Sequence, residues 1–163
     1  MTVSSEQHRW VPKIPWDDLQ SERSFQPIQV YNLTKLYNIL FTMELARRAA
    51  SRGVTVNCLS PGFLRTDLGR EAKGFFRLFL RLSRSFQKSP SAGAAAVIKV
   101  AESDVTGHYF KGAQLAEPSA LGKDPIAAAR LWEISSNLAA LRPAHSTAVE
   151  EAFQDVHSIR PEG

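Results

Sequence analysis

The chain has 163 residues, of which 44% are hydrophobic and 22% are charged, a balance typical of a globular domain rather than a disordered segment. A net charge of only +4 gives no basis for a nucleic-acid partner. The single cysteine, Cys58, excludes an internal disulfide, and the four histidines show no metal-ligand spacing. Because there is neither a signal-peptide pattern nor a spanning apolar run, we expect a location in the cytoplasm or on the cytoplasmic face of an intracellular membrane.

The first half of the chain predicts a strand, a loop, a helix and a second strand. Residues 1–5 have the character of a strand end, and the polar stretch 10–27 is interrupted by three prolines, which predicts a loop. Leucines at helical spacing predict a helix from about Tyr31 to Arg52, with a glycine after it as the stop. The β-branched run 54–59 predicts a short buried strand that ends in a turn at residues 60–62.

The second half predicts two more helices and one more strand. Ser89 before Pro90 is typical of a helix start, and we expect an alanine-rich helix to about Glu102. A strand is expected around residues 108–110, and Asp124 followed by proline predicts the start of the last helix. The apolar face expected for that helix comprises Ala127, Leu131, Ile134, Leu138 and Leu141. Alternation of strands and helices indicates an α/β fold class, with a compact small α/β domain as the alternative to part of a larger sheet.

A tyrosine and a lysine stand one helical turn apart in the sequence YNLTK. Tyr31 and Lys35 would share one face of the first helix, where an ammonium stabilises a phenolate and equips it for acid–base chemistry at an alcohol or carbonyl. The pair alone is more typical of an ordinary solvated helix face, where tyrosine and lysine often occur at this spacing by chance. Ser5 and the Pro61–Gly62 turn follow two different strands, however, and strand carboxyl ends are where ligands bind in open α/β sheets.

The segments VSS, YNLTK, GVTVNCLSPGFLRTDL and TGHYF, in this order, resemble the short-chain dehydrogenase/reductase family and are most similar to its retinol-dehydrogenase-like subgroup. The resemblance implies a partial Rossmann-like parallel sheet with flanking helices, truncated at the N-terminus. Residues 1–142 would form the C-terminal catalytic half of a single domain, and residues 143–163 a polar tail.

The same resemblance implies a role for each matching residue. Tyr31 would exchange a proton with the substrate oxygen, and Ser5 would hold that oxygen by a hydrogen bond. Lys35 would promote ionisation of Tyr31 and bind the nicotinamide ribose. The cofactor, NADP or NAD, would also contact Pro61 and Gly62 through its nicotinamide, and Thr66 through its carboxamide or pyrophosphate.

One departure from the family pattern bears on activity. No glycine-rich phosphate loop follows a strand anywhere in the 163 residues, so the pyrophosphate has no helix N-terminus on which to bind. We therefore expect weak cofactor binding and no turnover from this chain alone. The alternative is a non-catalytic truncated variant that binds partners or a membrane surface.

Residues 74–86 interleave phenylalanine and leucine with arginine, a mixture used by interfacial helices. By resemblance this segment would form a lid over a lipophilic substrate such as retinol or retinaldehyde and would make peripheral membrane contact. The alternative is a helix packed on its own domain with a solvated basic edge. A homodimer is a further expectation, whereas substrate identity, NAD versus NADP, reaction direction and oligomeric state are not encoded in any motif of this sequence.

Overall fold

A computed structural model describes residues 1–62 and 89–140 of the chain. Thr66, the predicted lid 74–86 and the predicted tail 143–163 lie outside the described residues. The strands are β1 (Thr2–Val3), β2 (Cys58–Ser60), β3 (Tyr109–Lys111) and β4 (Gln114–Ala116), and the α-helices are α1 (Pro27–Ala49), α3 (Pro90–Ala101) and α4 (Pro125–Ala140). Short 3₁₀ helices span Glu6–Trp10, Ala50–Arg52 and Leu121–Lys123.

The four strands form one sheet in the order β1-β2-β3-β4. The pairs β1–β2 and β2–β3 are parallel, which confirms the predicted α/β fold with a parallel sheet. β4 pairs with β3 in the antiparallel direction and was not predicted. The prediction of a strand over residues 54–59 was too long, because the Val56 carbonyl accepts from Gly107 N–H and the Val56 N–H donates to the Thr106 hydroxyl, which places this stretch beside a loop.

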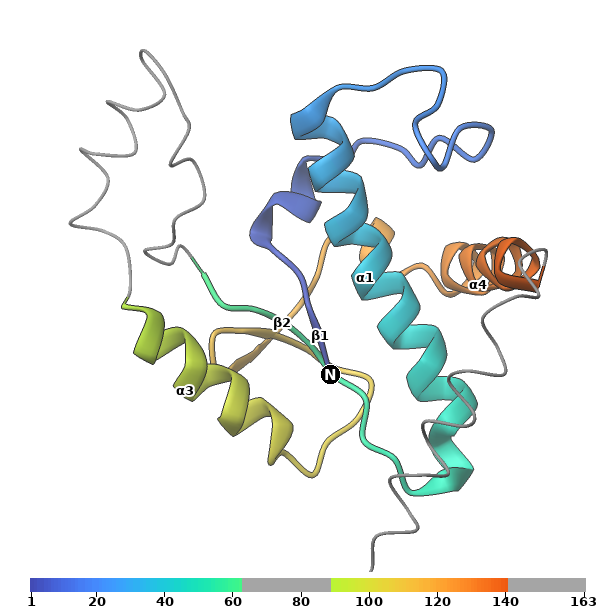
Figure 1. Cartoon of the computed structure of the whole chain (residues 1–163). Helices are drawn as coiled ribbons and strands as arrows, with labels where there is room; N and C mark the ends of the chain where they lie inside the picture. The colour runs from blue at the N-terminus through green and yellow to red at the C-terminus, as the bar shows by residue number, and fades with distance from the viewer. Residues whose placement is uncertain (63–88, 141–163) are drawn as a thin grey trace, which may run out of the picture.

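Helices cover both faces of the sheet, as Figure 1 shows for α1 and α3 on either side of β1 and β2. The strands can contact helices on both sides because successive side chains along a strand point to opposite faces of the sheet. Cys58 and Tyr109 cluster with Ile39 of α1. Their strand neighbours, Leu59 and Phe110, cluster instead with α3.

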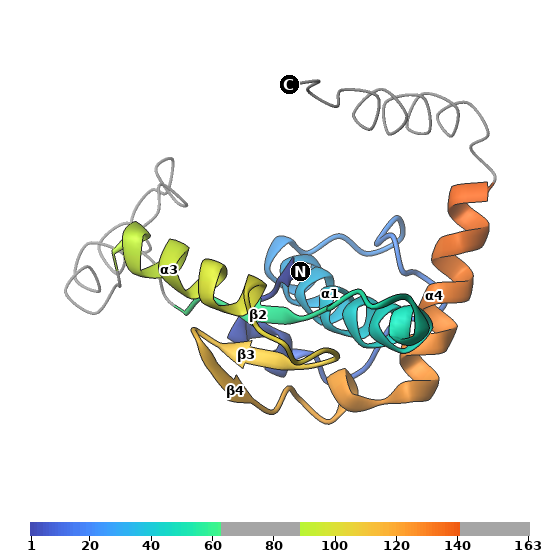
Figure 2. The same ribbon diagram turned by 90° about the horizontal axis from the view of Figure 1, so that it is seen from below.

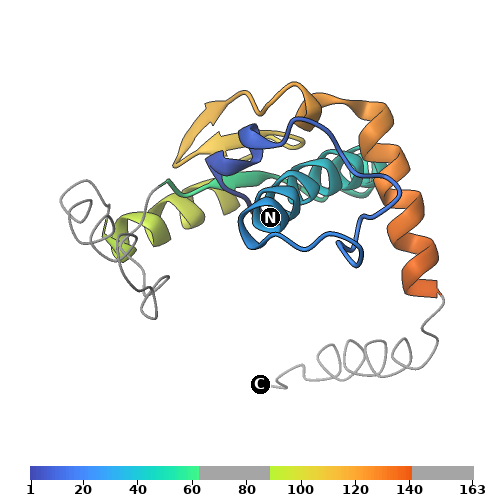
Figure 3. The ribbon, with the colours of Figure 1, turned by 90° about the horizontal axis from the view of Figure 1, so that it is seen from above.

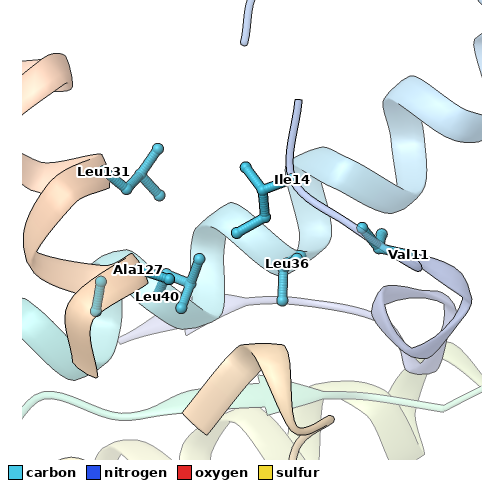
Figure 4. Packing of buried hydrophobic residues seen from close by; sticks show 7 residues of the cluster. Val11, Ile14, Leu36, Leu40, Ala127 and Leu131 are labelled. Atoms are coloured by element: carbon cyan, nitrogen blue, oxygen red, sulfur yellow. The ribbon is translucent and has the colours of Figure 1, made fainter. Parts of the chain in front are cut away.

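Helix α1 begins at Pro27, four residues before the predicted start, because proline is compatible with the first helical turn. Its end is close to the prediction: a 3₁₀ turn follows Ala49, and Gly53 adopts a left-handed conformation with φ 67°. The predicted leucine stripe packs as expected, with Leu36 and Leu40 fully buried. Figure 4 shows these two side chains between the 10–16 loop and α4.

Helix α4 crosses α1 and then projects beyond the body of the molecule (Figures 2 and 3). Its first half carries the buried residues Ala127, Ala128 and Leu131. The prediction that Leu138 belongs to the packed face was wrong: the residue is 42% exposed, because the helix has by then left its contact with α1. No helix within 1–62 or 89–140 combines the length and apolar character needed to span a bilayer.

Candidate active site

The carboxyl ends of β1 and β2 lie side by side because the two strands run parallel. The Ser4 N–H donates to the Leu59 carbonyl at 2.7 Å, which continues the ladder beyond Val3. Ser5 and Pro61, which follow these strands, therefore lie at the same edge of the sheet. This is the edge at which ligands bind in open α/β sheets.

The two adjacent serines make different contacts at this edge. Ser4 is buried, and its Oγ donates to the backbone carbonyl of Lys35 at 2.8 Å. Ser5 is half-buried and caps the 3₁₀ helix Glu6–Trp10, where its Oγ accepts from the Gln7 N–H at 3.3 Å. Within the described part of the chain, the Ser5 hydroxyl proton has no acceptor. This geometry favours Ser5 over Ser4 as the hydroxyl available to a ligand.

Hydrogen bonds between distant residues fix the position of α1 along β1. Besides the Ser4–Lys35 bond, Asn38 Nδ2 donates to the Val3 carbonyl at 2.9 Å. Thr2 Oγ1 lies 2.5 Å from Thr42 Oγ1. The sequence analysis missed these positioning roles, because each bond joins residues more than 30 positions apart and leaves no local pattern.

Tyr31 and Lys35 lie next to each other on the N-terminal part of α1. The Lys35 ammonium is 5.3 Å from the centroid of the Tyr31 ring, and the tyrosine is 36% exposed. Thr34, between them in sequence, donates its hydroxyl to the Tyr31 carbonyl at 2.8 Å, so it is occupied by the helix backbone. The predicted one-turn spacing therefore brings the phenol and the ammonium together, on the helix that is bonded to the strand leading to Ser5.

The turn after β2 contains Pro61 and Gly62, the two described residues predicted to contact the nicotinamide. Gly62 has φ 85°, a conformation that L side chains rarely adopt, and a Cβ built there would meet no atom of residues 1–62 or 89–140 within 4 Å. The Ser60 carbonyl is held by the Gly112 N–H at 2.7 Å. Among the described residues Lys35 forms no ion pair, so its ammonium is available.

A charged cluster that the sequence analysis missed lies beside Ser5. Glu6 accepts a 2.5 Å hydrogen bond from the hydroxyl of Tyr109 and forms ion pairs with Lys111 at 3.3 Å and Arg9 at 3.4 Å. Burial alone would raise the pKa of Glu6, but the hydrogen bonds from Tyr109 and Lys111 outweigh it and hold the pKa below its usual value. Glu6 is therefore an anionic anchor that binds the segment after Ser5 to β3.

The described residues also line two cavities. One, of about 350 Å³, lies between the Trp10–Pro15 loop and the first turns of α1 and is lined there by Asn32 and Leu33. The other, of about 240 Å³, lies at the amino ends of the strands, near Gly107 and Arg47. Neither is lined by Ser5, Tyr31 or Lys35, so neither is assigned to the candidate active site. In the described ranges no group of three or more potential metal-ligating side chains is found.

The fold and the site together define an α/β protein of the doubly wound class, with polar groups at the carboxyl ends of the parallel strands β1 and β2. A family model described as enoyl-(acyl carrier protein) reductase matches residues 17–103. The chain belongs to the short-chain dehydrogenase/reductase family and resembles its retinol-dehydrogenase-like members.

Individual relatives support this assignment. Human retinol dehydrogenase 14 is 39% identical over 151 residues, which cover 86% of this chain and 44% of that protein. The WW domain-containing oxidoreductase of Drosophila melanogaster is 35% identical, over 86% of this chain and 36% of its own length. A crystal structure of an uncharacterized protein from Mycobacterium Paratuberculosis superposes with a TM-score of 0.61 at 28% identity, over 83% of this chain and 48% of that one. The chain thus spans less than half the length of these relatives.

Proposed function

We propose that this chain supplies the proton-transfer half of a nicotinamide-dependent oxidoreductase that interconverts alcohols and carbonyls. The observation that carries the proposal is the placement of the Lys35 ammonium 5.3 Å from the Tyr31 ring, on a helix whose Lys35 carbonyl accepts a 2.8 Å hydrogen bond from Ser4. The Ser4–Lys35 hydrogen bond joins helix α1 to the residue next to Ser5, which supports a shared role for Tyr31, Lys35 and Ser5. Membership of a family of oxidoreductases supports the same chemistry.

In alcohol oxidation, Tyr31 in its phenolate form accepts the proton of the substrate hydroxyl, and the Ser5 hydroxyl donates a hydrogen bond to the same oxygen. A nicotinamide cofactor, when bound, would supply the hydride chemistry at the alcohol carbon. In the reverse direction Tyr31 returns a proton to the carbonyl oxygen. Lys35 stabilises the phenolate in both directions and offers an ammonium donor to the ribose. Pro61, Gly62 and Thr66 are the proposed contacts of the remaining cofactor groups.

The proposed substrates are lipophilic alcohols and aldehydes of the retinol and retinaldehyde type, because human retinol dehydrogenases 14 and 12 are among the relatives. The basic and aromatic segment 74–86, outside the described residues, would bring the site close to a membrane in which such substrates dissolve. Co-sedimentation with anionic vesicles, compared between the chain and a variant with Arg77, Arg81 and Arg84 replaced by glutamine, tests this part. Equal binding of both proteins would contradict it.

Activity is tested by oxidation of NADPH and of NADH with retinaldehyde. Two proteins are compared: this chain, and a chimera in which the N-terminal half of human retinol dehydrogenase 14 precedes it. We expect weak or no turnover from the first and measurable turnover from the second. A chain that binds partners or vesicles while the chimera remains inactive would favour the non-catalytic alternative.

Tyr31→Phe decides the role of the phenol. In the active chimera we expect kcat to fall by at least about 100-fold, the usual contribution of a general acid or base. Tyr37→Phe is a matched control on the same helix, because the Tyr37 hydroxyl is buried and has no hydrogen-bond partner among the described residues. Full activity in Tyr31→Phe would remove the catalytic assignment.

A further inference from the structure

His8 is a fully buried histidine whose two ring nitrogens both contact backbone groups. It lies three residues after Ser5, in the 3₁₀ helix Glu6–Trp10, and its exposure is 0%. Nδ1 lies 2.6 Å from the carbonyl oxygen of Ser5, and Nε2 lies 3.0 Å from the backbone nitrogen of Ser119. The imidazole therefore bridges the segment that carries Ser5 and the segment between β4 and α4.

These two contacts determine the protonation state of the ring. A carbonyl oxygen only accepts hydrogen bonds, so Nδ1 must carry the proton that is donated to Ser5. A backbone N–H only donates, so Nε2 must be the unprotonated acceptor of the Ser119 N–H. His8 is thus a neutral imidazole with its proton on Nδ1. Protonation of Nε2 would place two donors against each other in a site that water does not reach.

The surroundings of His8 hold it in this arrangement. The ring packs edge-on against Tyr109, with centroids 5.3 Å apart and an interplanar angle of 64°. The hydroxyl of Tyr109 donates in turn to Glu6, and Arg9 donates to the Glu117 carbonyl at 2.5 Å. Side chains on both sides of His8 in sequence therefore attach the same 3₁₀ helix to β3 and to the segment after β4.

We infer that His8 is a positioning residue for Ser5. The carbonyl of Ser5 accepts both the Nδ1–H of the His8 ring and the backbone N–H of His8, the latter at 3.1 Å. Holding this carbonyl fixes ψ of Ser5 at 153°, and with it the direction of the Cα–Cβ bond that carries the hydroxyl. The hydrogen bond from the Ser119 N–H to Nε2 makes the position of the Ser5 hydroxyl depend also on the segment between β4 and α4. The inference rests on the proposed function of Ser5.

The first test does not use activity. Nitrogen-15 NMR of the histidine rings in the 163-residue chain is expected to show His8 protonated on Nδ1 and unprotonated on Nε2 at pH 7. The amide proton of Gln7, bonded to Ser5 Oγ, reports the position of the hydroxyl. An Nε2–H tautomer or an imidazolium would overturn the inference, whatever the enzyme's activity.

Two near-isosteric variants separate the two ring nitrogens. In His8→Asn the amide nitrogen can take the place of Nδ1 and keep the donor to Ser5. In His8→Gln the amide oxygen can take the place of Nε2, so the bond from Ser119 is kept and the donor to Ser5 is lost. We expect the Gln7 amide resonance to shift much more in His8→Gln. His108→Gln, at an exposed histidine, is the control and leaves that resonance unchanged.

The second test measures kcat in the active chimera. Misplacement of a substrate-binding hydroxyl by a fraction of an ångström predicts a fall in kcat of about 10- to 100-fold in His8→Gln. In a Ser5→Ala background His8→Gln should lower kcat by less than about twofold, because the hydroxyl that His8 positions is already absent. An equal fall in both backgrounds would assign His8 a merely structural role and overturn the inference. If His8→Gln does not fold, the ring protonation in the wild-type chain still decides the question.

Failure of the inference and failure of the proposed function are distinguishable. A chimera without turnover contradicts the proposed function and leaves the NMR result on His8 to be judged separately. An active chimera in which Tyr31→Phe abolishes turnover, while His8→Gln moves neither the Gln7 resonance nor kcat, contradicts only the role of His8.

Discussion

Glu44 is a carboxylate that helix α1 buries almost completely, with its side chain 3% exposed. Arg47 donates two hydrogen bonds to it, at 2.7 and 2.8 Å, and Arg48 donates a third at 2.7 Å. The hydrogen bonds from Arg47, followed by that from Arg48, lower the pKa of Glu44 to about 2. Arg48 also lies over the ring of Trp132, 4.8 Å from its centroid, so the cluster links α1 to α4.

Replacement of Glu44 by glutamine should destabilise the fold in a pH-dependent way. Because the folded-state pKa lies below the usual value of 4.5, the carboxylate contributes its full stabilisation above about pH 4.5 and loses it as the pH falls towards 2. Urea unfolding at pH 7 should therefore show a loss of roughly 1.5–3 kcal/mol in Glu44→Gln, the range for hydrogen bonds to charged groups. The difference should shrink as the pH is lowered through this window. Glu133→Gln, at an exposed position of α4, should show neither effect.

At the residue scale, the sequence predicted the contacts that depend on local spacing. Tyr31 and Lys35 lie together because four residues make one helical turn, and Asp124 accepts from the N–H groups of Ile126 and Ala127 at the start of α4. The sequence analysis selected Ser5 over Ser4 by family resemblance alone, since both are serines at a strand end and no local pattern separates them. Their difference arises only when α1 places a carbonyl next to Ser4.

At the scale of elements, α3 shows how a cap defines a helix end. Ser89 accepts the Ala92 N–H on its Oγ at 3.2 Å, and proline occupies the first turn. Loss of an N-cap hydroxyl costs about 1 kcal/mol, so Ser89→Ala should lower the free energy of unfolding by roughly that amount. Ser89→Asp should retain the stability, because a carboxylate accepts the same bond and interacts favourably with the helix dipole. Equal losses in both variants, measured by urea denaturation, would contradict this role of the cap.

The sequence analysis missed or misplaced the features that depend on contacts with other elements, namely strand β4 and the buried part of α4. β4 has three residues and a two-residue connection at Gly112–Ala113, where Gly112 adopts φ 61°. A glycine between two short apolar runs was the available signal for this hairpin. The α4 periodicity predicted an apolar face correctly as far as Leu131 but could not show where α1 stops covering it. The spacing of apolar residues in a helix predicts which face of the helix is buried. How far along the helix that face stays buried depends on the neighbouring helix, here α1.

At the scale of the whole molecule, α1 connects the separate parts of the core. Leu36 and Leu40 pack with the 10–16 loop and α4, whereas Ile39 packs with Cys58 and Tyr109 on the sheet. Further along the same helix, Ala46 and Ala49 cluster with Val56. The aromatic pair Phe41–Trp132, with centroids 5.4 Å apart, adds a contact on the α4 side. Because α1 contributes residues to each of these three clusters, a change that weakens its packing in one cluster also disturbs the other two.

This arrangement predicts cooperative unfolding that is sensitive to a single leucine of α1. Leu40→Ala should lower the free energy of unfolding by about 2–5 kcal/mol, the cost of a cavity at a fully buried site. Leu138→Ala, at a residue that is 42% exposed, should cost well under that. In a Trp10→Phe, Trp16→Phe background, tryptophan fluorescence follows the α4 contact through Trp132, while far-UV circular dichroism follows all helices. If α1 joins the clusters as the packing indicates, the two signals should give the same urea midpoint in both variants. Separate midpoints in Leu40→Ala would show that α4 separates from α1 before the remaining helices unfold, and would contradict cooperative unfolding.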